Sequence, residues 1–219
     1  MVYFNGLQVF GLKKKSLSLN PYRFKHMPIM KKLLFPLLFI FPLMVNAQED
    51  MKKTLGEYLR LAEAKDSEKI MDYMYPGFFT LYPRHLMVEV MNRSFNDPAF
   101  EILLMDSRIL DISPLKTVDT VTYAVADYSV VMTLKYLESD DNPLPDAEAI
   151  ELTQGIFKQM YGEENVRYIP EETKFRITAA KKMLVLKTPG LTAWKVLGVE
   201  ENLKPVMKKI IPEKILEDL

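Results

Sequence analysis

The chain has 219 residues with 29 basic and 29 acidic side chains, and it contains no cysteine. The absence of cysteine excludes disulfide bonds, thiolate metal sites and a cysteine nucleophile. Charge is unevenly distributed: residues 1–47 carry seven Lys or Arg and no Asp or Glu, so residues 48–219 have a net charge of −7. This charge argues against a nucleic-acid-binding protein, whose contact surface is basic.

An apolar segment in the first fifty residues has the three parts of a secretory signal peptide. Two lysines precede an apolar run over residues 33–44, and a small residue, Ala47, follows at the cleavage position. The run is shorter than the about 20 residues that a membrane-spanning helix needs, and it contains two prolines. We therefore expect residues 30–47 to be a signal peptide that is removed between Ala47 and Gln48.

The signal peptide divides the chain into three parts. Residues 1–29 are either a long leader or the result of a mis-set start, with translation beginning at Met27 or Met30, and we favour the mis-set start. Residues 48–219 have a length typical of one domain. We expect this product to be a secreted protein, periplasmic or extracellular. It should have no stable membrane span, and it should carry no lipid, because lipoprotein processing requires a cysteine.

Three helices are predicted first in the mature part. Apolar residues recur at three- and four-residue spacing over 50–65. A second helix begins after Asp66 or Ser67 and ends at Pro76-Gly77, and a third runs from Pro83 to about Phe95. Methionines on the last two helices could mark an adaptable binding surface, but core packing is the favoured interpretation.

The apolar period then changes to two, which predicts strands over 100–105 and 108–112 and a long strand or bent pair over 117–137. In the longest of these, apolar residues occupy odd positions before Ala126 and even positions after Asp127. A change of face within one strand predicts an extra residue, so we expect a bulge near Ala126 and Asp127.

The remaining elements are a helix over 146–161, a hairpin and a terminal strand. The hairpin strands are 166–169 and 174–187, and the last strand is 193–199. A helical tail, 202–218, follows a core of about 50–200. Strands do not alternate with helices, so the predicted class is α+β: N-terminal helices packed on a strongly bent antiparallel sheet, with one helical insertion and a C-terminal helical tail.

This pattern resembles the nuclear-transport-factor-2-like (NTF2-like), cystatin-like superfamily, and within it uncharacterised secreted bacterial members. The resemblance covers about 50–200 and is carried by the helices of 50–95, the kinked strand 117–137 and the closing strand that contains Trp194, Lys195 and Val196. It implies a cone-shaped pocket between the helices and the bent sheet. Helix 146–161 and the tail 202–218 are additions to the minimal fold.

Candidate site residues follow from that pocket. Some members of the superfamily are isomerases that use a pocket carboxylate with a tyrosine or histidine, and Asp127 is the candidate carboxylate here. Tyr73, Tyr123 and Trp194 are candidate ligand-binding residues. The alternative is that Asp127 is solvated or hydrogen-bonded at the predicted bulge and that the aromatic residues belong to the core, and we favour this alternative.

His85, the one histidine of residues 48–219, could be a general base, although a surface position is the favoured interpretation. We expect no metal site and no cofactor.

Three functional hypotheses remain. The preferred one is a non-enzymatic exported domain that binds a small apolar ligand or a partner protein. The alternative is a small-molecule isomerase- or hydratase-like enzyme that uses Asp127. A third hypothesis is an oligomer formed through the tail 202–218.

The position of the signal peptide predicts the N-terminus of the precursor and the N-terminus of the mature protein. We expect the unprocessed precursor to begin at Met27 or Met30, and the mature protein to begin at Gln48. Mass spectrometry of both forms measures these N-termini. A peptide from residues 1–20 in the precursor would contradict the mis-set start.

Overall fold

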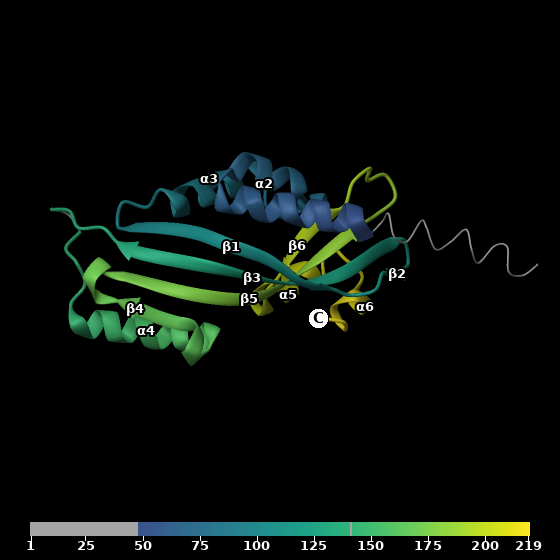
Figure 1. The fold of residues 1–219 in the computed structure, drawn as a ribbon. Helices are drawn as coiled ribbons and strands as arrows, with labels where there is room; N and C mark the ends of the chain where they lie inside the picture. Colours follow the sequence, from purple (N-terminus) through teal and green to yellow (C-terminus); the bar gives the residue numbers. More distant parts are fainter. Residues whose placement is uncertain (1–47, 141) are drawn as a thin grey trace, which may run out of the picture. The chain divides into compact units, whose positions relative to one another are not determined.

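The computed structural model describes residues 48–219 except residue 141. The expected leader and signal peptide, residues 1–47, lie outside the described residues. Within the described part, every helix is too short or too polar to span a membrane. This part has the predicted α+β class: helices come first, followed by an open, antiparallel six-stranded sheet with one inserted helix and a helical tail (Figure 1).

The three predicted N-terminal helices are present. The first covers residues 48–63 of the described chain, and it is followed by α2 (Ser67–Tyr73) and α3 (Arg84–Phe95). Asp66 begins α2 because its side chain accepts a hydrogen bond from the backbone N–H of Lys69. The short helices α2 and α3 pack on helix 48–63 through a cluster of buried apolar side chains, Leu61, Ile70, Met71 and Val88.

The sheet is built around two long strands. β3 (Val121–Tyr136) pairs with β5 (Lys174–Lys187) in one unbroken register, from Thr122 opposite Lys187 to Lys135 opposite Lys174. The other strands flank this pair, and they are β1 (Phe100–Ile112), β2 (Lys116–Val118), β4 (Val166–Ile169) and β6 (Lys195–Val199). The order is β1-β3-β5-β4, with β2 beside β3 and β6 beside β5.

The irregularity that the sequence predicted for β3 is found in the neighbouring strand, β1. β3 keeps its register with β5 through Ala126 and Asp127, so the prediction of an extra residue in β3 is wrong. The extra residues lie in β1, whose register with β3 shifts between Met105 and Arg108 and again between Ile109 and Asp111. The second shift lies opposite Asp127, so the irregularity is near the expected level of the sheet.

The change of apolar face along β3 has a different cause: different elements pack on the strand at its two ends. At the start of β3 both faces are buried: Tyr123 faces the C-terminal tail, while Ala124 and Ala126 lie beneath helix 48–63. The small alanine side chains let the helix approach the sheet closely. Farther along, the even-numbered Met132 and Leu134 contact the inserted helix. The pattern of apolar residues along β3 therefore reflects which element packs on each face.

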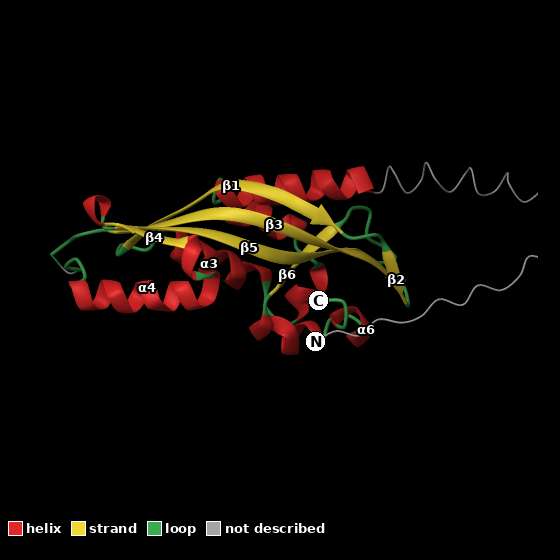
Figure 2. Ribbon diagram, turned by 60° about the horizontal axis from the view of Figure 1, so that its bottom comes forward, coloured by secondary structure: helices red, strands yellow, loops and turns green. Residues whose placement is uncertain are grey.

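The inserted helix α4 (Ala147–Tyr161) follows β3 in the chain and lies beside the end of the sheet that carries β4 (Figure 2). Asp146 caps its first turn, and Gly162 ends it with φ +94°, a conformation that favours glycine. On its inner side the ring of Phe157 meets Phe175 of β5 edge to face, with ring centroids 5.3 Å apart.

The C-terminal tail contains two short helices, α5 (Lys204–Met207) and α6 (Glu213–Leu216). Met207, Ile211 and Ile215 are buried against the sheet side chains Leu184, Leu186 and Leu197. The larger apolar side chains of the tail are therefore used within the chain. A contact between chains through the tail stays a prediction.

The tail should contribute strongly to stability. Ile215 is completely buried, so Ile215→Ala should lower the free energy of unfolding by about 2–4 kcal/mol, as expected for a large-to-small core substitution. Urea denaturation measures this change. The exposed Lys209, changed to Ala, is the control, and equal effects of the two substitutions would contradict a structural role for the tail.

Candidate functional site

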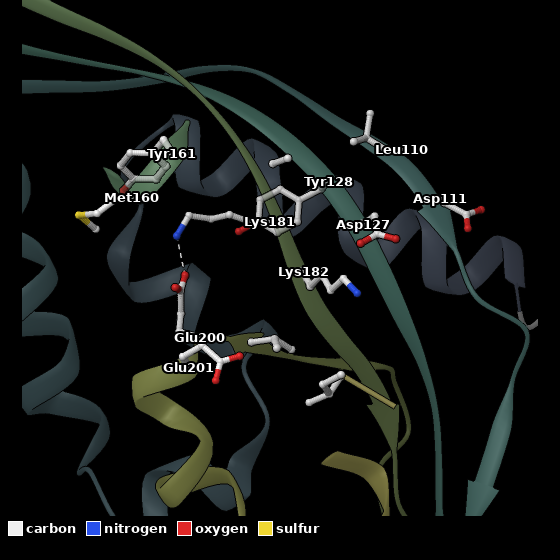
Figure 3. A pocket seen from close by; sticks show the side chains of 13 residues that line it. Leu110, Asp111, Asp127, Tyr128, Met160, Tyr161, Lys181, Lys182, Glu200 and Glu201 are labelled. Atoms are coloured by element: carbon white, nitrogen blue, oxygen red, sulfur yellow. Dashed lines mark hydrogen bonds and ion pairs between the residues drawn. The ribbon is translucent and has the colours of Figure 1, made fainter. Parts of the chain in front are cut away.

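An open groove of about 680 Å³ lies at the edge of β5. Side chains from both faces of the sheet line it (Figure 3). Its lining includes Leu110, Asp111, Asp127, Tyr128, Met160, Tyr161, Ala180, Lys181, Lys182, Val199, Glu200, Glu201 and Leu219.

One wall of the groove is a row of residues in register across four strands. Asp111 of β1 lies opposite Asp127 of β3, which lies opposite Lys182 of β5, which in turn lies opposite Val199 of β6. Directly paired residues of antiparallel strands share a face, so these side chains are neighbours. Two carboxylates opposite each other repel, and the ammonium group of Lys182 on the next strand offsets part of that repulsion.

The edge of β5 is open beside the groove. β3 occupies one side of β5 along its whole length, so β4 and β6 both pair with the other side. β4 pairs as far as Ile177, and β6 begins to pair at Lys182. Among the described strands, none pairs with residues 178–181 on this side. This short segment therefore presents unpaired backbone groups.

Lys181 lies in this opening and is held by two groups. Its Nζ atom is 2.5 Å from Oε1 of Glu200 and 5.9 Å from the centroid of the Tyr161 ring. Figure 3 shows Lys181 directed toward Glu200 and Tyr161, whereas Asp127 and Lys182 lie on the other side of the β5 ribbon. Burial raises the pKa of the neighbouring Tyr128, so its hydroxyl stays neutral well above neutral pH.

A smaller pocket of about 180 Å³ adjoins the groove and brings two predicted residues together. Asp127 and Tyr123 both line it, and Lys182 is shared with the groove. The hydroxyl of Tyr123 donates a hydrogen bond to Asp218 of the tail, and Asp218 also accepts one from Nζ of Lys116 at 2.8 Å. The hydroxyl that an enzyme would need as a proton donor beside Asp127 therefore binds a carboxylate of the same chain.

These contacts shift the ionisation of both partners. Burial, followed by the hydrogen bond to Asp218, raises the pKa of Tyr123 to about 12. The hydrogen bonds from Lys116 and Tyr123 lower the pKa of Asp218. At neutral pH a neutral phenol and an ammonium group thus hold a carboxylate, and this contact fixes the end of the tail beside the sheet.

The other candidate residues lie elsewhere. Trp194 is buried beneath helix 48–63, and the half-buried Tyr73 packs against the same cluster. Tyr123 contacts the tail on the opposite face, so the three predicted ligand-binding aromatic residues do not form one pocket. His85 is exposed in the first turn of α3.

Sequence reasoning missed most of the groove. Lys181 and Lys182 carried a usable signal, because two consecutive lysines interrupt the alternation of the strand directly before the apolar run 183–186. Tyr161, Glu200 and Asp111 carried none, since strand pairing brings them together from distant parts of the chain.

Comparisons with family models, curated proteins and solved structures gave no match to this chain. The resemblance to the NTF2-like superfamily therefore stays a prediction.

The contact between Tyr123 and Asp218 predicts a specific dependence of stability on pH. In the unfolded chain tyrosine ionises near pH 10, whereas Tyr123 ionises at about 12 in the folded protein. Between these values the folded state holds the additional proton, so the free energy of unfolding falls as the pH rises through this interval. Tyr123→Phe removes this group, and the stability advantage of the wild type over the variant should shrink between about pH 10 and pH 12.

Urea denaturation at a series of pH values measures this difference. The partly exposed Tyr82, changed to Phe, is the matched control. A wild-type advantage over Tyr123→Phe that stays constant across the interval would contradict the assignment.

Proposed function

We propose that the mature protein is an exported binding domain that holds an extended segment of a partner protein against the open edge of β5. The observation that supports this is the unpaired length of β5 at residues 178–181, of which Ala180 and Lys181 line the groove. Addition of a strand to an exposed sheet edge is a common mode of peptide recognition, in which backbone hydrogen bonds supply affinity and side-chain pockets supply specificity.

The dimensions of the opening set the length of the ligand. Four strand residues span about 14 Å, which accommodates about four residues of an added strand. Alternate residues of β5 direct their N–H and C=O groups away from β3, so an added strand would pair with those groups. The flanking strands β4 and β6 limit the added strand at both ends.

The lining of the groove sets the chemistry of the ligand. Asp111 and Asp127 bring negative charge, whereas Glu200 and Glu201 are already paired with Lys181 and Lys204. Apolar and aromatic contacts come from side chains that surround the opening, Leu110, Tyr128, Met160, Tyr161 and Val199. We therefore propose a segment that combines an apolar side chain with a basic side chain long enough to reach across β5 toward Asp127, the carboxylate of the adjacent strand β3.

The sequence left two kinds of ligand open, a small apolar molecule and a partner protein, and the groove favours the partner protein. An apolar small molecule needs an enclosed apolar cavity, which buries most of its surface. The groove is open and carries six ionisable charged side chains, so a polypeptide backbone fits it better. The enzyme hypothesis receives less support, because the hydroxyl of Tyr123 beside Asp127 is bound to Asp218.

A peptide library displayed on phage and selected against the purified protein tests the proposal. We expect enriched peptides with a basic residue and an apolar residue, and synthetic copies should bind in a calorimetric titration. Ala180 is exposed and lines the groove. Ala180→Arg adds both bulk and positive charge there, and should weaken binding at least about tenfold, or 1.4 kcal/mol.

The control is Thr117→Arg, which adds the same side chain to an exposed strand position outside the groove lining. Its affinity for the peptides should match that of the wild type. The proposal fails if no peptide is enriched, or if the peptides bind the Ala180→Arg protein as tightly as the wild type.

A further inference from the structure

The outward face of α4 carries a row of exposed apolar side chains. Leu152, Ile156 and Met160 are spaced four residues apart, and they are 67%, 49% and 64% exposed. Residues four apart lie on one side of a helix, so the three form a continuous apolar ridge. A ridge of this kind on a helix whose other side is already packed marks an interaction surface.

A glycine lies beside the ridge in the middle of the helix. Glycine in a helix interior costs about 1 kcal/mol relative to alanine. Neither the conformation nor the packing of this chain explains Gly155: its φ is not positive, and a Cβ atom added there would meet no atom of the chain within 4 Å. Glycine at such a position lets a second backbone approach closely.

The ridge and the glycine together form a surface with both a projection and a recess. A shallow hollow of about 520 Å³ lies over Gly155, and Leu152 and Ile156 border it. Glu148, Glu151 and Gln159 complete its lining. The inner side of α4 is anchored through Phe157 and Tyr161, so this surface has a fixed orientation.

We propose that this surface binds the same surface of a second copy, with the two α4 helices antiparallel and crossing at Gly155. A two-fold symmetric interface uses one patch on both chains, so the patch must be complementary to itself. Here each copy supplies the ridge that fills the partner's hollow. The proposal is independent of peptide binding in the groove, although Met160 borders both surfaces.

The polar residues select the antiparallel orientation. Glu151 and Gln159 lie four residues before and after Gly155, so antiparallel helices that cross there place Glu151 of each copy opposite Gln159 of the other. The amide group of Gln159 can donate a hydrogen bond to that carboxylate. Parallel helices would place Glu151 opposite Glu151, where like charges repel.

The size of the surface predicts a weak dimer. One pair of fifteen-residue helices gives contact over about 22 Å. Such a contact buries less area than a standard stable interface, so we expect a dissociation constant in the micromolar range.

Sedimentation velocity over a concentration series tests the dimer. The wild type should shift from monomer to dimer, and Ile156→Glu should stay monomeric. Val90→Glu is the matched control, because Val90 is a comparably exposed apolar residue (56%) on the separate helix α3. A wild type that stays monomeric throughout, or an equal effect of both substitutions, would overturn the proposal.

Gly155→Ala separates binding from folding. The added methyl group has space within the chain and favours the helix, so the melting temperature should rise. The same methyl group should increase the dissociation constant of the dimer at least about tenfold, because it separates the two backbones. A variant that is more stable and dimerises as well as the wild type would contradict the crossing at Gly155.

Cysteine cross-linking tests the orientation, because the natural chain has no cysteine. A mixture of Glu151→Cys and Gln159→Cys proteins should form the mixed disulfide dimer under oxidation, and neither protein alone should form a disulfide dimer. Efficient cross-linking of Glu151→Cys to itself would show parallel helices and reject the antiparallel arrangement.

Discussion

The unbroken pairing of β3 with β5 determines where the other elements of the described domain lie. Its register runs without a shift from Thr122 opposite Lys187 to Lys135 opposite Lys174, so it fixes which side chains share each face. Helix 48–63 covers one face at the start of β3, and the tail covers the other. Toward the other end, α4 covers the face that carries Phe175 and Ile177. Each covering element uses a different stretch of the same strand pair.

The groove lies where helix 48–63, the tail and α4 no longer pack on the sheet. β5 is almost wholly apolar from Met183 to Leu186, and it carries Lys181 and Lys182 immediately before that stretch. The two lysines direct charge to opposite faces at the level where β6 stops pairing. Charge is tolerated there because neither face is fully covered. An edge lysine also discourages unspecific strand pairing.

Sequence patterns predicted the elements more accurately than their contacts. The helices, the strands and the stop at Gly162 follow from local periodicity and turn residues, and the α+β class follows from their order. The location of the bulge could not be predicted in this way. Which positions of β3 are apolar depends on helix 48–63 and on the tail, and both are distant from β3 in sequence. Both helix 48–63 and the tail bury apolar residues of β3. The sequence alone therefore could not distinguish a change in the element that packs on the strand from an inserted residue.

The candidate site shows the same division. Asp127 was identified as a site residue because it follows the change of parity, and the structure does place it in both cavities. Tyr73 and Trp194 were grouped with it because aromatic residues suit a pocket, yet the fold puts them in the cluster beneath helix 48–63. Asp111 reaches Asp127 only because β1 contains two extra residues. Register shifts of this kind leave no clear pattern in one sequence.

The tail connects the stability of the domain to the shape of the groove. Its buried residues Met207 and Ile215 pack on the sheet, and Asp218 binds both Tyr123 and Lys116. Leu219, the next residue, lines the groove. Part of the groove lining therefore depends on the packing of the tail, which the hydrogen bonds of Asp218 help to hold beside the sheet. Because Asp127 and Lys182 border both the groove and the pocket beside Asp218, a ligand that binds these side chains also contacts the surroundings of the tail. Binding at the β5 edge and packing of the tail should thus stabilise each other, since each orders side chains that the other uses.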